Sequence, residues 1–328
     1  MVILSIDGGA SRTRGVLFTE GGAVSVHRET EATSLSRADA DAEQLLGLFI
    51  AELADQSGLG IEGVDLVNVG VAGVSNQDAR ERLLKELDAL GVSEDRSLVT
   101  SDVEAAYETV WGEASGVLVC VGTGAIGWAR DSAGQTFRAS GRGPQLGGDP
   151  GGGYWLGKQA MVQLIMNERA SDEQLDELRD RITAASGADS FDEAARLMGA
   201  AENMVAATAL LGKTVCVLAE EGNEAALAMV QEGTRSLADD LLGMIEEAGL
   251  RQDSMVIGMH GAVIENSPLF RRLLAGSLCY DVPAIEWRAP EIDPVFGAGL
   301  MACRLQEVEV DLAALKHNWS ERLVRTPG

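Results

Sequence analysis

The sequence predicts an α/β protein made of two similar halves, a duplicated fold whose two sheets face one ligand cleft. The same order of elements, strand-strand-strand-helix-strand-helix-strand-helix, is predicted twice along the 328 residues. In each half the first strand runs directly into a glycine turn, at residues 7–9 and 122–124. Because ligands of open α/β sheets bind at the carboxyl ends of parallel strands, both turns are expected to face the same cleft. The alternative is two unrelated α/β domains.

The first half begins with a short apolar run at residues 2–6, which is typical of a buried strand. Two further strands are expected at residues 14–19 and 23–28, joined by a glycine turn. An apolar stripe predicts an amphipathic helix over residues 39–56. The half is completed by a strand at 64–73, a helix at 77–90, a strand at 97–102 and a helix at 103–111.

The second half repeats this order and adds helices. Strands are predicted at residues 116–121, 125–130 and 135–139, followed by a long helical region from 152 to 249. A strand at 254–259, a helix at 267–275, a strand at 284–287 and a helix at 294–306 complete the set. We therefore expect a first domain at 1–115, a second domain with a helical insertion at 116–307, and a short, polar, peripheral tail at 308–328.

Composition bounds the partners and the compartment. The formal net charge of −25 should repel nucleic acid and anionic membranes. No apolar run approaches the roughly 18 residues of a membrane helix, and the N-terminus has no basic segment typical of a signal peptide. None of the four cysteines lies in a C-x-x-C pair, so we expect buried thiols and a cytoplasmic, reducing location.

The first glycine turn, residues 7–13, has the residue types of a phosphate loop. Its glycines, Gly8 and Gly9, permit close approach of backbone N–H groups to phosphate oxygens. Ser11, Arg12 and Thr13 add two hydroxyl groups and a cation. Asp7 is a carboxylate suited to hold Mg²⁺ through water. The alternative is an ordinary hairpin turn with an acidic cap.

The second turn, Gly122-Thr123-Gly124, begins a literal G-x-G-x-x-G match that ends at Gly127. A dinucleotide site requires a helix directly after the glycines, whereas residues 125–139 are predicted to be a hairpin. The prediction is therefore a second phosphate loop of the strand-turn-strand kind.

Two acidic residues are candidates for work on a substrate. Asp102 follows a strand and opens a helix, where it is either a helix cap or an acceptor for a hydroxyl proton. Asp149 lies in a glycine-rich stretch, residues 147–153, which is either a flexible connector or a substrate loop.

These motifs, in this order, resemble the N-acetylglucosamine kinase branch of the BadF/BadG-type ATPase family, within the sugar kinase, actin and heat-shock chaperone superfamily. The resemblance extends over residues 2–305 and also includes GVAG, YWLG, GMHGAV and FGAGLMA. It implies duplicated ribonuclease H-like, actin-like ATPase domains, a cytoplasmic homodimer, and a small sugar and ATP with Mg²⁺ as ligands. The resemblance implies that the turns at Asp7 and at Gly122–Gly124 hold the phosphates and the metal, that Gly261 and Ala262 hold the adenosine, that Asp102 is the catalytic base, and that Ser34, Asp102, Thr123 and Asp149 bind the sugar.

The chain departs from the family pattern on the sugar side. Pro150 and Gly152 replace the Glu and Ser of the usual Gly-Asp-Glu-Gly-Ser, Gly143 stands where a Trp is usual, and Ser34 stands where an Asn is usual. These departures favour a kinase of an amino sugar, such as N-acetylglucosamine or glucosamine, without strong preference for the former.

Two other functions remain open within the same family. One is an ATPase that activates a radical dehydratase, which requires a cysteine-bound iron–sulfur cluster that the scattered cysteines do not suggest. The other is a non-catalytic protein that binds ATP and a sugar. The presence of Asp102 favours a kinase, since a sensor needs no base.

Overall fold

The chain passes between two units twice. The computed structural model describes residues 1–35, 42–143, 148–169, 171–252, 254–278 and 284–325. Unit 1 consists of residues 1–113 and 290–328, and unit 2 consists of residues 114–289. The predicted domain division differs from this one, because residues 290–307 belong with the N-terminal unit.

Unit 1 contains a five-stranded mixed sheet of order β3-β2-β1-β4-β5. Strands β1, β2 and β3 are antiparallel neighbours, whereas β4 and β5 run parallel to β1. The strands are β1 (Val2–Gly8), β2 (Arg12–Thr19), β3 (Val24–Glu31), β4 (Leu66–Val71) and β5 (Ser97–Thr100). The helices are α1 (Ala42–Gln56), α2 (Gln77–Ala89), α3 (Asp102–Trp111), α11 (Gly297–Leu305) and α12 (Leu312–Arg325).

Unit 2 contains a second five-stranded sheet, of order β10-β9-β6-β7-β8. Its strands are β6 (Gly116–Val121), β7 (Ala125–Arg130), β8 (Thr136–Ser140), β9 (Met255–His260) and β10 (Ile285–Arg288). Read from β8, this order repeats that of unit 1 strand for strand, with β6 in the place of β1. The predicted duplicated α/β fold is confirmed.

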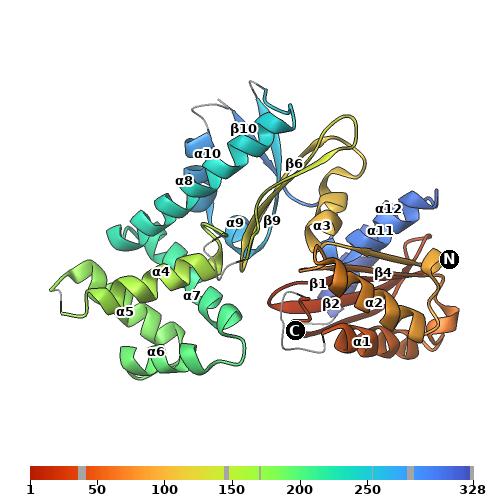
Figure 1. Ribbon diagram of the computed structural model, residues 1–328, viewed down its shortest axis with the longest axis horizontal. Helices are drawn as coiled ribbons and strands as arrows, with labels where there is room; N and C mark the ends of the chain where they lie inside the picture. The colour runs from red at the N-terminus through yellow and green to blue at the C-terminus, as the bar shows by residue number, and fades with distance from the viewer. Residues whose placement is uncertain (36–41, 144–147, 170, 253, 279–283, 326–328) are drawn as a thin grey trace. The chain divides into compact units, whose positions relative to one another are not determined.

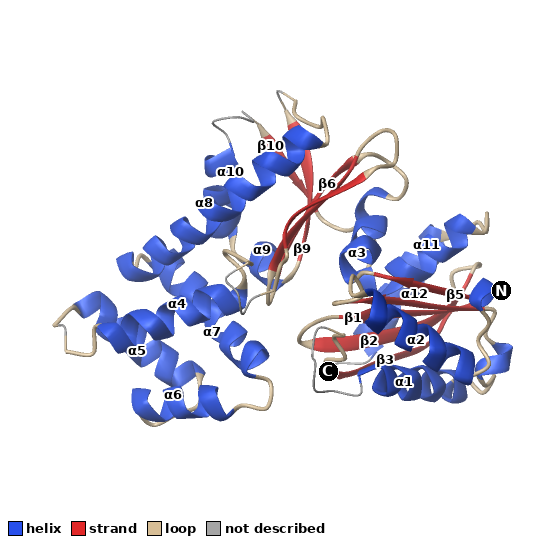
Figure 2. Ribbon diagram, viewed as in Figure 1, coloured by secondary structure: helices blue, strands red, loops and turns tan. Residues whose placement is uncertain are grey.

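The helical insertion of unit 2 lies between β8 and β9 (Figure 2). It comprises α4 (Gly153–Met166), α5 (Glu173–Ala185), α6 (Phe191–Ala200), α7 (Met204–Glu221) and α8 (Glu224–Glu247). Two shorter helices, α9 (Ala262–Asn266) and α10 (Pro268–Leu278), follow β9. Burial of aliphatic side chains from both the sheet and these helices forms one continuous core for the unit.

The sheet of unit 1 buries apolar residues on both faces, as a sheet with parallel strands requires. Leu4 and Ile6 of β1 belong to a core that includes residues of α1 and α2. Ile3, on the opposite face, packs in a second core with Phe296 and Trp319. The alternation along β1 therefore fixes which helices cover each face.

The expectation of a peripheral tail at 308–328 is wrong. Residues 312–325 form α12, in which Leu315 is fully buried and Trp319 is 5% exposed. The ring of Trp319 makes edge-to-face contacts with Phe296 and His27. Figure 1 shows the blue helices α11 and α12 beside the red and orange N-terminal strands. The apolar side chains spaced along one face of α12 complete a core that the sheet alone would leave open.

Candidate active site

At one edge of its sheet, where the parallel strands end, unit 1 places the first glycine turn, the GVAG segment (residues 70–73) and Asp102. Asp7, Gly70 and Thr100 are aligned across the parallel strands β1, β4 and β5. Two strand spacings of about 4.8 Å each separate the backbones of Asp7 and Thr100. Asp102 follows Thr100 by two residues, so the first glycine turn and the candidate base leave the same edge of the sheet.

The Asp7 carboxylate is held by Arg14, which also contacts Asp293. Arg14 Nη2 donates to Asp7 Oδ2 at 2.6 Å, and Arg14 Nη1 lies 2.9 Å from Asp293 Oδ1. The Arg14 side chain is 13% exposed. Burial alone would lower the pKa of Arg14, but the charges of Asp7 and then Asp293 outweigh it and raise that pKa above its usual value. Arg14 therefore keeps its positive charge between the two carboxyl groups.

The other polar residues of this turn have different surroundings. Arg12 is exposed and forms an ion pair with Glu29 at 3.3 Å. Thr13 is fully buried, and its hydroxyl oxygen lies 2.6 Å from that of Thr33. Ser11 is exposed at the tip, and Gly8 and Gly9 complete the turn with a Gly9 N–H to Arg12 carbonyl bond of 3.0 Å. The turn is thus a tight hairpin, and the phosphate-binding role of its members stays a prediction.

Ser34 lies near the same edge. Its side chain is buried, and its hydroxyl donates to the carbonyl of Ala72 at 3.4 Å, just beyond the end of β4. The neighbouring Leu35 N–H donates to the same carbonyl at 2.9 Å. The position of Ser34 is consistent with its predicted contact to a sugar, which stays a prediction.

Asp102 is the first residue of α3, but it is not the helix cap. The cap is Ser101, whose hydroxyl oxygen accepts from the Glu104 N–H at 3.2 Å. Glu104 Oε2 in return accepts from the Ser101 N–H at 3.0 Å, which completes a capping box. Thr100 also donates to this carboxylate at 2.8 Å. Asp102 is thus not the N-cap, although its Oδ1 accepts the N–H of the next residue, Val103, at 3.0 Å. Its half-buried side chain lies at the junction between β5 and α3.

The second glycine turn, in unit 2, is closed mainly by backbone groups. The carbonyls of Gly122 and Thr123 accept from the N–H groups of Gly153 and Tyr154 at 2.8 and 3.0 Å. These donors are at the start of α4. Gly152 allows this approach, because a Cβ there would lie 2.7 Å from the backbone of Gly124. The predicted phosphate loop is thus part of one packed unit with the helix that follows the glycine-rich stretch.

The glycine-rich stretch is not a flexible connector in its described part. Asp149, Pro150 and the glycines at 151–153 are all buried. Asp149 is 6% exposed and accepts the Gly143 N–H at 3.2 Å. Gly143 has a φ of 100°, which explains the absence of a large side chain at this position. Residues 144–147, including Gly147, lie outside the described residues.

The carboxyl of Asp149 has an unusual environment. Burial raises its pKa, and the N–H groups of Gly143 and Ala125 with the charge of Arg138 offset this only in part. A hydrogen-bonded carboxyl beside the Gly122–Gly124 turn can orient that turn or accept a ligand hydroxyl. Its predicted sugar contact stays a prediction.

The segment expected to hold adenosine lies beside the second turn. Strands β6 and β9 pair in parallel with Cys120 opposite His260, so Gly122 and Gly261 leave neighbouring strands at the same edge. Glu265 Oε1 accepts the Gly261 N–H at 2.9 Å and lies 2.9 Å from His260 Nδ1. This ties the start of α9, including Ala262, to the end of β9.

The residues around Asp7 fit Mg²⁺ only as part of a larger ligand set. No group of three or more His, Cys, Asp or Glu able to hold a metal occurs among the described residues. Mg²⁺ commonly keeps several waters and binds through one or two carboxylates plus substrate phosphates. A single oriented carboxylate at the end of β1 suits that mode, in which ATP supplies further oxygens.

A model of the BadF/BadG/BcrA/BcrD ATPase family matches residues 4–302. The chain belongs to this family. It is 22% identical over 307 residues to an N-acetylmuramic acid/N-acetylglucosamine kinase of Clostridium acetobutylicum, with 92% of this chain and 97% of that protein covered.

Solved structures agree on the fold. A Chromobacterium violaceum protein assigned as an N-acetylglucosamine kinase gives a TM-score of 0.71 at 22% identity, covering 92% of this chain and 98% of its own. A ROK family glucokinase of Streptomyces griseus, solved with glucose and AMPPNP, gives 0.55 at 15% identity, covering 93% and 99%. The chain thus shares its duplicated α/β fold with these two solved structures.

Sequence reasoning missed Arg14 and Asp293. Arg14 had a detectable signal, since a hairpin with its turn at residues 9–12 places Asp7 and Arg14 directly opposite each other. Asp293 had none, because it is 279 residues from Arg14 in the chain. Glu104 was also missed, although Ser101 followed three residues later by Glu is a capping-box pattern.

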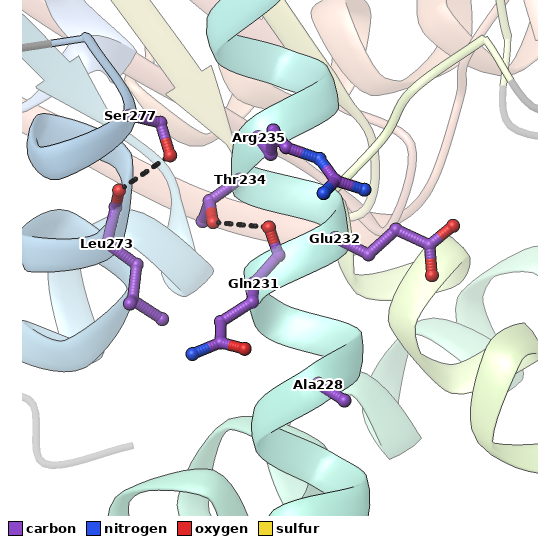
Figure 3. A pocket seen from close by; sticks show the side chains of 7 residues that line it. All are labelled: Ala228, Gln231, Glu232, Thr234, Arg235, Leu273 and Ser277. Carbon is purple, nitrogen blue, oxygen red and sulfur yellow. Dashed lines mark hydrogen bonds between the residues drawn. The ribbon is translucent and has the colours of Figure 1, made fainter. Parts of the chain in front are cut away.

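A separate hollow lies between α8 and α10 of unit 2 (Figure 3). It has a volume of about 460 Å³ and is lined by Ala228, Gln231, Glu232, Thr234, Arg235, Leu273 and Ser277. The Thr234 and Ser277 hydroxyls donate to carbonyls of their own helices. None of the predicted site residues lines this hollow. The candidate site is therefore placed by the residue types at the ends of the strands and not by the volume of a hollow.

The described cysteines differ in how far they are buried. Cys216 and Cys303 are buried, and burial raises their thiol pKa values to about 12 and about 11. Cys120 is only half-buried, which corrects the expectation for it, and Cys279 lies outside the described residues.

Within the described residues, no helix combines the length and apolarity needed to cross a membrane.

Proposed function

We propose that this chain is an ATP-dependent kinase that phosphorylates a small sugar, most simply an amino sugar such as N-acetylglucosamine or glucosamine. The observation that carries the proposal is the position of Asp102. It lies at the sheet edge from which the Asp7 turn also leaves, and the N-cap of α3 is Ser101 in a capping box with Glu104, not Asp102 itself.

In the proposed reaction, Asp102 accepts the proton of the sugar hydroxyl that attacks the terminal phosphorus of ATP. A bond forms between the sugar oxygen and that phosphorus, the bond to the bridging oxygen breaks, and ADP leaves with the bonding electrons. Phosphoryl transfer depends mainly on positioning and on neutralisation of charge, with the carboxylate orienting the hydroxyl. Mg²⁺, when bound with ATP near Asp7, would neutralise charge on the phosphate oxygens.

The glycine turns supply positions for the nucleotide in this proposal. The turn at Gly122–Gly124 is held by the start of α4, and its small residues leave the backbone accessible to phosphate oxygens. Gly261 and Ala262 follow the adjacent strand β9 and would contact the adenosine. Family membership supports the use of ATP, and we further propose a cytoplasmic homodimer.

The kinase relative from Clostridium acetobutylicum and the glucose- and AMPPNP-bound glucokinase support a sugar and ATP as substrates. The identity of the sugar rests on the departures around Asp149 and Ser34. Pro150 has no N–H to donate, and Gly143 contributes a backbone N–H to Asp149 where the family pattern has a Trp. These features favour a wider pocket with fewer contacts to an acetamido group.

The test is ATP consumption with purified protein and a panel of N-acetylglucosamine, glucosamine, N-acetylmannosamine and glucose. We expect kcat/KM for N-acetylglucosamine to exceed that of the best competitor by less than roughly a hundredfold. A larger preference would overturn the substrate proposal and leave the kinase proposal intact. No sugar-dependent ATP consumption across the panel and a set of sugar acids would contradict the kinase proposal.

One observation favours a second function, that of a non-catalytic protein that binds ATP and a sugar. Pro150 and Gly152 replace the Glu and Ser of the family's usual sugar loop, so fewer polar groups are present to orient a sugar for transfer. Under this alternative a sugar from the panel would bind in calorimetry without ATP turnover. The Asp102→Asn variant would then bind ATP and sugar as the natural chain does, with no activity to lose.

A further inference from the structure

Arg14 forms a bridge between two carboxylates that are far apart in the sequence. Its Nη2 lies 2.6 Å from Asp7 Oδ2, and its Nη1 lies 2.9 and 3.1 Å from the two oxygens of Asp293. The side chains of Asp7, Arg14 and Asp293 are 17%, 13% and 21% exposed. Partial burial reduces the screening of these contacts by water and salt.

The geometry of the bridge requires a guanidinium. Asp7 and Arg14 are directly opposite each other in the hairpin of β1 and β2, so the backbone places them in contact. One arm of the planar fork takes Asp7 and the other takes Asp293. A lysine at this position keeps the charge but cannot hold both carboxylates in fixed directions.

Asp293 is itself anchored. It is the N-cap of the short helix η4 (Pro294–Phe296), and its Oδ1 accepts the Val295 N–H at 3.0 Å. Phe296, at the end of η4, is buried between Phe18 and Trp319 in the second core of unit 1. The direction of the Arg14 fork is thus fixed by a segment that lies just after the chain returns to unit 1 at Pro290.

We propose that Arg14, held by Asp293, is a positioning residue that fixes the orientation of the Asp7 carboxylate for the divalent cation bound with ATP. The inference rests on the proposed function, since it takes from it the role of Asp7 toward Mg²⁺. With Oδ2 bound by Arg14, rotation of the carboxyl group is restricted, and Oδ1 would be the oxygen left to bind the cation or one of its waters. Groups that orient metal ligands in this way commonly change metal affinity roughly 10- to 100-fold when replaced.

A second buried ion pair in the same unit provides a matched control. Arg304 binds Glu108 with two contacts, Nε to Oε1 at 2.8 Å and Nη2 to Oε2 at 2.9 Å. Arg304 is 25% exposed and Glu108 6%, so the pair is partly buried, as the Arg14 cluster is. It contains no residue placed in the candidate site, and its replacement reports the loss of an ion pair alone.

The experiment measures binding of Mn²⁺, followed by electron paramagnetic resonance, to the full chain saturated with AMPPNP. AMPPNP affinity without metal is measured in parallel. We expect Arg14→Lys to weaken Mn²⁺ binding roughly 10- to 100-fold and to leave metal-free AMPPNP affinity unchanged. Arg304→Lys should alter thermal stability without altering Mn²⁺ affinity. If Arg14→Lys fails to fold, Asp293→Asn, which retains an N-cap acceptor, should weaken Mn²⁺ binding in the same direction.

A double-mutant cycle separates an action through Asp7 from a direct contact. In an Asp7→Asn background, Arg14→Lys should have no further effect on Mn²⁺ affinity. Unchanged Mn²⁺ affinity in folded Arg14→Lys, an equal effect of Arg304→Lys, or an undiminished effect in the Asp7→Asn background would each overturn the inference. Loss of metal-free AMPPNP binding would assign Arg14 to the phosphate instead and would also overturn it.

The sugar is absent from this experiment, so its outcome is distinguishable from that of the proposed function. If the chain phosphorylates no sugar but Mn²⁺ binding still depends on Arg14, the proposed kinase function is overturned and the positioning role of Arg14 is supported. If the chain is an active kinase and Arg14→Lys binds Mn²⁺ normally, the kinase function is supported and the positioning role is overturned.

Discussion

The two glycine turns have the same place in their sheets, after β1 in unit 1 and after β6 in unit 2, but their surroundings differ. The first is flanked by charged side chains, with Asp7, Arg14 and Asp293 in one cluster. The second is held by the backbone N–H groups of Gly153 and Tyr154. In the duplicated fold, the turn after β1 is therefore surrounded by charged side chains, whereas the turn after β6 is held mainly by backbone hydrogen bonds.

The difference predicts opposite sensitivities to mutation. At the charged edge, replacing a carboxylate by its amide leaves the packing intact and should change chemistry. At the edge built from backbone, adding one methyl group forces the chain itself to move and should change stability. Three experiments, with four variants, test this contrast.

The largest effect is expected for Asp102→Asn. If the carboxylate accepts the sugar proton, its loss should lower kcat roughly 100- to 10,000-fold. The thermal midpoint should stay within a degree or so, because the helix is capped by Ser101 and Glu104. Steady-state kinetics and a thermal melt on the same preparation measure both. Near-normal turnover would remove Asp102 from the mechanism.

The next effect compares one methyl group in each turn. A Cβ at position 152 would lie 2.7 Å from the Gly124 backbone, whereas one at Gly9 would lie 3.3 Å from the Arg12 carbonyl. We expect Gly152→Ala to destabilise the protein by about 1–3 kcal/mol in denaturant unfolding, and Gly9→Ala to have a clearly smaller effect. Equal losses for the two variants would show that the turns are packed alike.

The smallest effect concerns the pH dependence of stability at Asp149. Its pKa in the folded chain is raised, chiefly by burial, so the unfolded chain releases this proton at lower pH. The contribution of Asp149 to stability is therefore fully present below its unfolded pKa, about 4, and is lost as pH rises through the folded pKa. Asp149→Asn cannot lose a proton, so its stability relative to the natural chain should improve as pH increases. Melts of both proteins between pH 3.5 and 7 give the difference, and a difference that moves the other way would mean that the carboxylate is stabilised by its N–H donors.

Much of the fold was predictable because its signals are local. Short apolar runs ended by glycine gave the strands, and β6 and β7 have the predicted bounds, 116–121 and 125–130. The repeated element order gave the duplication, which the matching strand orders of the two sheets confirm. The positions of Asp7, Asp102 and the Gly122–Gly124 turn at strand ends also follow from this local pattern.

The remainder depends on contacts between distant segments. No periodicity indicates that residues 290–325 return to unit 1, where Trp319 packs against Phe296 and His27. The sequence of α12 resembles a polar tail because only a few of its side chains are apolar. Those side chains become buried only when the helix packs against the core of unit 1.

The sequence by itself determined the two strand-turn-strand motifs, the acidic residues at strand ends and the family. Only the tertiary structure decided that Arg14 joins Asp7 to Asp293, and that Asp149 is buried and bonded to the Gly143 N–H. The reason is physical. Strands and turns form according to residues a few positions apart in the sequence. The ion pairs of a guanidinium and the burial that shifts the pKa of a carboxyl group are set only after distant segments have packed together.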